Sequence, residues 1–147
     1  MKLVVSAVRT PRAGWTDEPC ADWGRRIARH FPFEDRVVRP STAEAEAEAL
    51  FSTLGPRSRL IALDERGVDL TSPELAEVLE RCAQDAVSVL VFALGGAYGH
   101  APIVRERAWK TVRLSAMVMA HAVARVVLIE QVYRACAIRR GEPYHHV

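Results

Sequence analysis

The sequence contains few of the features that define large classes of proteins. Its three cysteines, Cys20, Cys82 and Cys136, are far apart and form no CxxC pair, so neither a disulfide framework nor a zinc knuckle is expected. We interpret them as buried thiols. The sequence has no GxGxxG or Walker A loop, which argues against dinucleotide or ATP binding. It also contains no identifiable serine–histidine–aspartate or cysteine–histidine set, although such sets assemble in space.

Long apolar runs are absent as well. The longest is interrupted by Arg125, Glu130 and Arg134, and no run approaches the roughly 18 residues that a membrane span requires. The first residues, MKLVVSAVRTPR, are too short for a signal peptide and fit a strand better. We therefore expect a cytoplasmic protein with one domain over residues 1–147.

Lysine is scarce, since eighteen of the twenty basic residues are arginines, and the net charge is only +2. This charge is unevenly distributed. Residues 40–85 contain ten acidic and four basic side chains, whereas from Gly95 onward there are eight Lys/Arg and three Glu. A basic C-terminal third suggests an anionic partner, with nucleic acid ahead of acidic small molecules.

Alternating strand and helix patterns predict an α/β fold with a mainly parallel sheet flanked by helices. Residues 87–94, VSVLVFAL, form the strongest strand pattern and should be buried on both faces. Ser41 is expected to cap a helix, and residues 64–67 to form a turn. Strands are predicted at 2–8, 33–38, 59–63 and 87–94, an extended segment at 114–119, and helices at 17–30, after 41, at 71–83, 101–109 and 120–139.

The last predicted helix has almost no wholly polar face, which indicates burial on more than one side, against the sheet and against a second subunit. His121 and Arg125 are four residues apart, as are Glu130 and Arg134, so each pair shares a helix face. The pairs fit either an ordinary surface arrangement or a polar site at the mouth of a buried helix.

A glycine-rich loop, Gly95-Gly96-Ala97-Tyr98-Gly99, follows the strongest strand at its carboxyl end. Ligands bind at that edge in open α/β sheets, and glycines let backbone N–H groups approach a nucleotide closely. A simple tight turn fits this pattern equally well.

The chain ends in Tyr144, His145 and His146, beside Arg139 and Arg140. Rings and guanidinium groups suit a flipped or single-stranded base, whereas fraying is the usual state of a chain end. The histidines have no carboxylate or thiolate cluster to support a metal site, so no metal is expected.

Four segments together resemble the RlmH family of the SPOUT, or α/β-knot, methyltransferases. Their order, spacing and total length fit that family over essentially the whole chain. The segments are LDERG at 63–67 with TSPELA at 71–76, GGAYG at 95–99, His121 with RVVLIEQVYRA at 125–135, and RGEPYH at 140–145.

The resemblance implies a homodimer with a trefoil knot in its C-terminal half. Such a dimer would use S-adenosylmethionine to methylate N3 of a pseudouridine in large-subunit (23S) ribosomal RNA, and one subunit's tail could complete the other's site. By position, the implied cofactor-binding residues are Leu63, Gly95 and its neighbour Gly96, Leu114, Ser115, Ala116, Met117, Val118 and Met119. The pattern of the residues also indicates the two loops, but Leu63 is supported by the resemblance alone.

Methylation at N3 requires loss of a proton and alignment of the base. In such a mechanism, the RNA would be held or its base oriented by Arg125, Arg134, Tyr144 and His145. The resulting candidates are Arg125, Arg134, Arg139 and Arg140 for RNA binding, and His121, Tyr144 and His145 for catalysis.

The chain departs from the family pattern in three places. Ala120 stands where proline is common, Ala122 where a polar residue is common, and Arg9-Thr10 where a glycine–lysine pair is common. Two alternatives stay open: a SPOUT methyltransferase acting on another RNA, and a non-catalytic RNA- or ribosome-binding dimer that has lost the cofactor.

Overall fold

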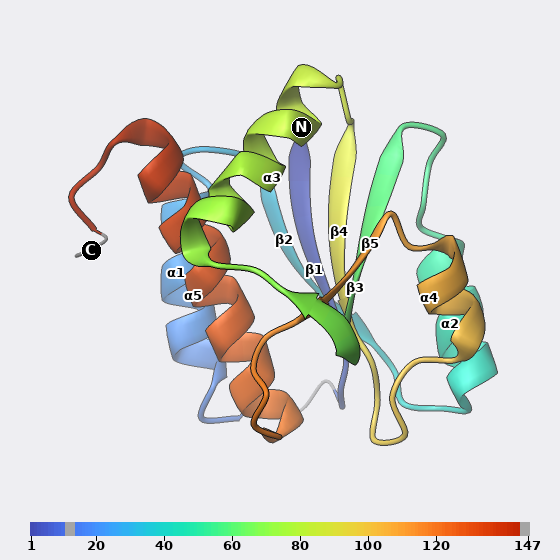
Figure 1. The fold of residues 1–147 in the computed structure, drawn as a ribbon. Coiled ribbons are helices and arrows are strands. Elements are labelled where there is room, and N and C mark those ends of the chain that lie inside the picture. Colours follow the sequence, from blue (N-terminus) through green and yellow to red (C-terminus); the bar gives the residue numbers. More distant parts are fainter. Residues whose placement is uncertain (11–13, 145–147) are drawn as a thin grey trace.

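A computed structural model describes residues 1–10 and 14–144 (Figure 1). Its strands are β1 (Lys2–Val8), β2 (Phe33–Val38), β3 (Ser58–Asp69), β4 (Val89–Leu94) and β5 (Lys110–Arg113). Its helices are α1 (Asp17–Ile27), α2 (Ala43–Phe51), α3 (Ser72–Gln84), α4 (Pro102–Arg107) and α5 (His121–Arg140). The described strands pair in parallel throughout, which confirms the predicted α/β fold.

The sheet has the strand order β2-β1-β4-β3-β5, so β4 is inserted between β1 and β3. Helices α1, α3 and α5 cover one face, and α2 and α4 cover the other (Figure 1). Successive side chains of a strand point to opposite faces. Leu3 and Val5 accordingly belong to the first core and Val4 to the second. The central strand β4 is buried on both faces, as its apolar run predicted.

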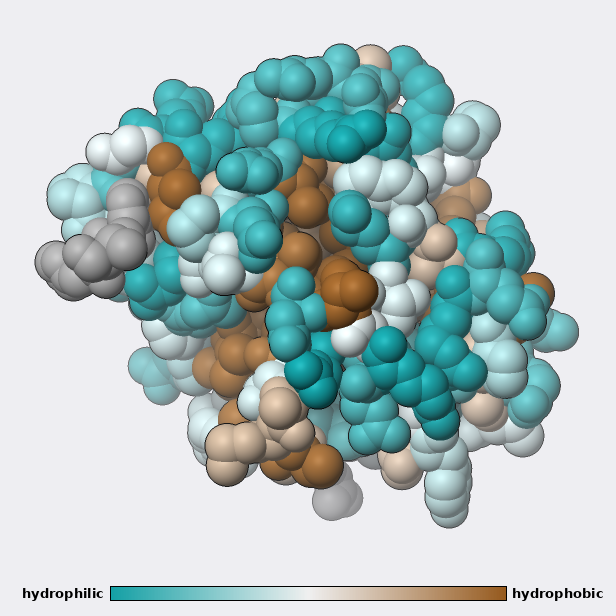
Figure 2. Space-filling model, in the orientation of Figure 1, coloured by the Kyte–Doolittle hydropathy of each residue, from teal (hydrophilic) through white to brown (hydrophobic). Residues whose placement is uncertain are grey.

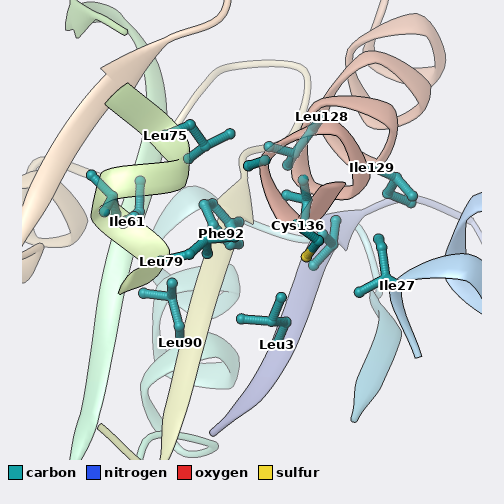
Figure 3. Close-up of a cluster of buried hydrophobic side chains, with 14 of the residues drawn as sticks. Leu3, Ile27, Ile61, Leu75, Leu79, Leu90, Phe92, Leu128, Ile129 and Cys136 are labelled. Atoms are coloured by element: carbon teal, nitrogen blue, oxygen red, sulfur yellow. The ribbon is translucent and has the colours of Figure 1, made fainter. Parts of the chain in front are cut away.

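Helix α5 lies between α1 and α3 in the layer that covers the sheet. Its residues Leu128, Ile129 and Cys136 are at most 2% exposed and point into the larger core with Phe92 (Figure 3). The neighbouring helices thus cover several sides of α5 within one chain. Its apolar surface therefore does not by itself require a second subunit.

The sequence pattern predicted the N-cap of α3 correctly and placed the N-cap of α2 one residue too early. Thr71 caps α3 through a capping box in which Thr71 Oγ1 accepts from the N–H of Glu74 and Glu74 accepts from the N–H of Thr71. For α2, the cap is Thr42, whose Oγ1 accepts from the N–H of Ala45 at 3.1 Å. The predicted cap, Ser41, instead donates its N–H to Glu46.

The predicted turn at residues 64–67 is wrong, because β3 continues through it to Asp69 with a bulge between Leu63 and Val68. A Cβ on Gly67 would lie 2.5 Å from the carbonyl carbon of Val112, so glycine permits the close approach of β5 here. Strand β5 itself was not predicted. Val112 is its only buried residue, and a short edge strand leaves no apolar run to detect.

Other boundaries differ by a few residues: α1 ends at Ile27 and α4 at Arg107, both earlier than predicted. All three cysteines are free and buried, as expected. Within residues 1–10 and 14–144, no helix is long and apolar enough to span a membrane.

Candidate cofactor and RNA site

A pocket of about 150 Å³ lies beside the carboxyl end of β5, the start of α3 and the middle of α5. Figure 2 shows apolar residues gathered near the centre of this side of the molecule, surrounded by hydrophilic ones. A concave apolar surface with few polar groups is typical of small-molecule sites. The pocket is lined by Ile61, Leu63, Leu70, Thr71, Leu75, Phe92, Val112, Arg113, Leu114, Val127, Leu128 and Gln131.

Two predicted cofactor residues, Leu63 and Leu114, line this pocket. Leu63 pairs with Leu94 at the end of β4 and with Val112 of β5. It is 8% exposed, and its side chain belongs to the core beneath the pocket. The structure therefore places Leu63 at a pocket, a position that the sequence pattern did not indicate.

The rest of the predicted cofactor segment leads away from the pocket lining. Residues 114–120 connect β5 to α5 without regular structure and with bends at 114, 116 and 117, where an extended segment was predicted. The N–H of Met117 donates to Ser115 Oγ at 2.9 Å, which forms a local turn. Met117 and Val118 are 79% and 93% exposed. In the single chain, these two apolar side chains face solvent.

The predicted glycine loop after β4 is tightly closed. Gly96 and Gly99 form a backbone bridge, and Gly99 has a φ of 75°, a conformation that favours glycine. A Cβ on Gly95 would lie 2.9 Å from the carbonyl carbon of Gly99 and 3.0 Å from the nitrogen of His100. A side chain at Gly95 would therefore push the loop apart.

His121, at the start of α5, contacts this loop directly, with Nδ1 2.9 Å from the carbonyl oxygen of Gly95. A carbonyl oxygen can only accept, so Nδ1 must carry a proton. In the neutral ring, Nε2 is then the basic nitrogen. The structure thus brings together two residues, His121 and Gly95, that are distant in sequence and were both predicted to belong to the site.

On the other side of the glycine loop, Asp64 and His100 are held by hydrogen bonds. Burial alone would raise the pKa of Asp64, but the N–H of Arg66 and the guanidinium of Arg105 outweigh it and lower the pKa. Burial lowers the pKa of His100, whose Nε2 lies 3.0 Å from the carbonyl oxygen of Ala93. Asp64 is therefore ionised and His100 neutral at neutral pH.

Arg125, predicted to contact RNA, is 4% exposed. Its Nε lies 3.1 and 3.2 Å from the carboxylate oxygens of Asp35, and Nη2 donates to the same group. Its Nη1 donates to Asp17 at 3.1 Å and to Thr16 Oγ1 at 3.3 Å. This position supports a structural role, which holds the start of α5 on α1 and β2, rather than direct contact with RNA.

Glu130 and Arg134 form the predicted pair, with Arg134 Nη2 donating to Glu130 Oε1 at 2.7 Å. Tyr144 Oη donates to the same oxygen at 2.9 Å, and the guanidinium of Arg134 lies 4.9 Å from the Tyr144 ring centroid. The described part of the tail therefore packs on α5 instead of fraying. Burial raises the pKa of Tyr144, and the hydrogen bond to Glu130 adds to this effect, so the phenol stays protonated at neutral pH.

The two remaining residues predicted to bind RNA, Arg139 and Arg140, differ in their contacts and exposure. Arg139 donates to Glu80 of α3, and its guanidinium lies 5.0 Å from the Phe31 ring centroid. Arg140 is exposed. The predicted catalytic residue His145 and its neighbour His146 lie outside the described residues.

The single chain does not bring the catalytic candidates His121 and Tyr144 together. The Tyr144 hydroxyl is bonded to Glu130, nine positions after His121 on α5, which corresponds to about 13 Å along the helix axis.

The start of α3 belongs to the site, although its sequence indicated only a helix start. Thr71 and Leu75 line the pocket, and Ser72 Oγ donates to Gln131 Oε1 at 2.6 Å. The signal that could have revealed this is position. A helix that begins directly after a strand of a parallel sheet must start at the carboxyl edge, where ligands bind.

Among residues 1–10 and 14–144, no group of three or more His, Cys, Asp or Glu side chains is arranged to hold a metal ion.

Comparison with known proteins identifies the class to which this fold and pocket belong. Residues 1–145 match the family described as "Predicted SPOUT methyltransferase". The chain is 44% identical to "Ribosomal RNA large subunit methyltransferase H" of Geobacter sulfurreducens, over 99% of this chain and 100% of that protein. It is 42% identical to the protein of the same name from Geobacter metallireducens, over 99% of each. The chain therefore belongs to the SPOUT methyltransferase family.

A solved structure of the SpoU methyltransferase AviRb from Streptomyces viridochromogenes, in complex with the cofactor AdoMet, aligns with a TM-score of 0.48 at 16% identity. The alignment covers 96% of this chain and 61% of that one.

Proposed function

We propose that the protein is an S-adenosylmethionine-dependent methyltransferase that acts on N3 of a pseudouridine in 23S ribosomal RNA. The observation that carries this proposal is the pocket lined by Leu63 and Leu114, in a chain whose family is defined by methyl transfer. The name shared by the relatives, Ribosomal RNA large subunit methyltransferase H, supports ribosomal RNA as the substrate. A protein with this substrate would act in the cytoplasm.

The chemistry of the pocket fits the cofactor. Apolar walls suit an adenine ring, and Thr71, Gln131 and Arg113 are polar members of the lining. Arg113 pairs with Asp69, and Gln131 bonds Ser72 and Glu130, so a ligand would have to share or replace these contacts. The absence of a side chain at Gly95 lets the loop close on Gly99 and His100 at the end of β4. When bound, S-adenosylmethionine supplies an electrophilic methyl group.

The remaining work of the reaction falls to this chain's own side chains. The N3 proton must leave before or during transfer, and the basic Nε2 of His121 is suited to accept it. Tyr144 is a poor base because its pKa is raised, but its protonated hydroxyl can donate a hydrogen bond. Arg140 provides exposed positive charge near the tail, which suits the RNA backbone, whereas Arg134 and Arg139 are paired with Glu130 and Glu80.

We further propose that the active form is a homodimer. Met117, Val118 and Val123 are exposed apolar side chains around the start of α5, and a second copy would remove them from water. The separation of His121 from Tyr144 supports a site in which one subunit supplies the pocket and the other supplies its tail. The family resemblance also supports a trefoil knot, and the contact of His121 with Gly95 joins the two segments that would form it.

The test is methyl transfer to ribosomes from a strain that lacks the modification, with the product mapped by mass spectrometry. The variant Leu114→Trp should fill the pocket and abolish both cofactor binding, measured by calorimetry, and transfer. The matched control is Ile103→Trp on α4, which introduces the same side chain on the other face of the sheet.

A single methylated pseudouridine in 23S RNA, lost in Leu114→Trp but not in Ile103→Trp, would support the proposal. Cofactor binding without methylation of ribosomes would point to another RNA. A well-folded protein that does not bind the cofactor would instead indicate a non-catalytic RNA-binding function.

A further inference from the structure

A chain of hydrogen bonds connects the wall of the pocket to the C-terminal tail. It begins at Ser72, the first residue of α3, whose Oγ donates to Gln131 Oε1 at 2.6 Å. Gln131 Nε2 donates to Glu130 Oε2 at 2.8 Å. The other oxygen of Glu130, Oε1, accepts from Tyr144 Oη and from Arg134. The middle member, Gln131, is itself a lining residue of the pocket.

The charge of Glu130 sets the direction of every bond in this chain. An ionised carboxylate only accepts, so the Gln131 amide must turn its NH₂ group toward Glu130. The amide oxygen then faces Ser72, whose hydroxyl has to donate. Glu130 is 16% exposed and pairs with Arg134, so water has limited access to its carboxylate and the amide has one favourable orientation.

These contacts point to a role for two residues outside the predicted site. We propose that Ser72 and Gln131 are positioning residues that transmit the state of the pocket to Tyr144 through Glu130. A ligand that contacts Gln131 changes the hydrogen bond from Gln131 to Glu130 Oε2. The hydrogen bond from Tyr144 to Glu130 Oε1 changes in turn. This inference rests on the proposed function insofar as the ligand is S-adenosylmethionine and the tail serves methyl transfer.

The link can be measured first without any ligand. Tyrosine labelled with ¹³C at Cζ provides three ring signals, and Tyr144→Phe assigns the one of interest. Ser72→Ala and Gln131→Leu should each shift the Tyr144 signal, because each removes a bond from the chain. The matched controls are Ser52→Ala, whose hydroxyl donates to the carbonyl of Ala49 in α2, and Gln84→Leu, whose amide donates to Glu80 within α3. Both controls should leave the signal unchanged.

The second measurement is a double-mutant cycle on single-turnover methyl transfer. Ser72→Ala should slow transfer about fivefold, the equivalent of one net hydrogen bond. Its affinity for S-adenosylmethionine should stay within about twofold, since Ser72 does not line the pocket. In a Tyr144→Phe background, Ser72→Ala should slow transfer by less than about 1.5-fold, because the end of the chain is already missing.

The outcomes separate this inference from the proposed function. A Tyr144 signal that shifts in neither Ser72→Ala nor Gln131→Leu overturns the link. The link is also overturned if Ser72→Ala slows methyl transfer fivefold in both the wild-type and the Tyr144→Phe protein. If the wild-type protein does not methylate RNA, the proposed function fails, yet the signals of the free protein still decide the link. They also decide it if Tyr144→Phe is inactive.

Discussion

The substitution Arg125→Met tests whether the Arg125 guanidinium stabilises the fold or contacts RNA. Methionine keeps much of the apolar stem but removes all donors. The change leaves the carboxylates of Asp35 and Asp17 without their shared cation. Arg9 compensates little, because its Nη2 lies 3.8 Å from Asp35.

The expected cost follows from the burial of these groups. Removing one partner of a buried ion pair costs about 3–5 kcal/mol. The Asp35 and Asp17 side chains are 20% and 39% exposed, so water screens part of the lost interaction, and about 2–3 kcal/mol is expected. For a domain of this size, that corresponds to a fall in Tm of about 6–9 °C.

Thermal and urea unfolding, followed by circular dichroism, measure this change. Arg140→Met is the matched control, because Arg140 is exposed and its loss should cost less than about 0.5 kcal/mol. Adding Asp35→Asn to Arg125→Met should cost less than the sum of the two single changes, since no charge is then left unpaired at Asp35. If Arg125→Met weakened RNA binding at unchanged stability, Arg125 would be an RNA contact and the structural role assigned to it would be wrong.

Three further predictions concern the loop, the acid stability and the tail. Gly95→Ala should weaken S-adenosylmethionine binding, measured by calorimetry, because its Cβ would clash with the loop; Gly55→Ala, whose Cβ would have no neighbour closer than 3.8 Å, is the control. The Arg36 guanidinium is the main cause that lowers the pKa of Glu34 from 4.5 to about 2, so the ionised carboxylate adds stability above pH 4.5 that is lost as the pH falls toward 2. After discounting for solvent screening, this contribution is about 1 kcal/mol. In Glu34→Gln, the free energy of unfolding in urea should therefore fall less steeply between pH 5 and 3 than in the wild type, and an unchanged slope would contradict this. Deleting residues 144–147 should leave the circular dichroism spectrum intact and abolish methyl transfer, and full activity of the truncated protein would exclude a role for the tail.

Sequence patterns located most of the fold because they depend on local physics. The eight-residue apolar pattern at 87–94 predicted the buried central strand, and the capping box at Thr71 predicted the start of α3. Local patterns failed at β5 and at residues 64–67. Pairing between distant segments decides both: the bulged end of β3 is extended because β5 lies against it.

The candidate site shows the same division between local and non-local effects. The position of the glycine loop could be predicted because the loop directly follows the strongest strand pattern, at the carboxyl end of that strand. The roles of the arginines on α5 could not, because helical spacing indicates which residues share a face but not what that face meets. Arg125 meets Asp35, 90 positions away in sequence, so its burial was not visible in the spacing from His121.

By itself, the sequence determined the α/β class and the family, because these depend on residue types and their order along the chain. Only the tertiary structure decided that Leu63 and Leu114 share a pocket, that Arg125 is buried and that His121 is separated from Tyr144. Each of these facts depends on which distant segments pack together, and packing is set by the whole set of cores rather than by any one segment.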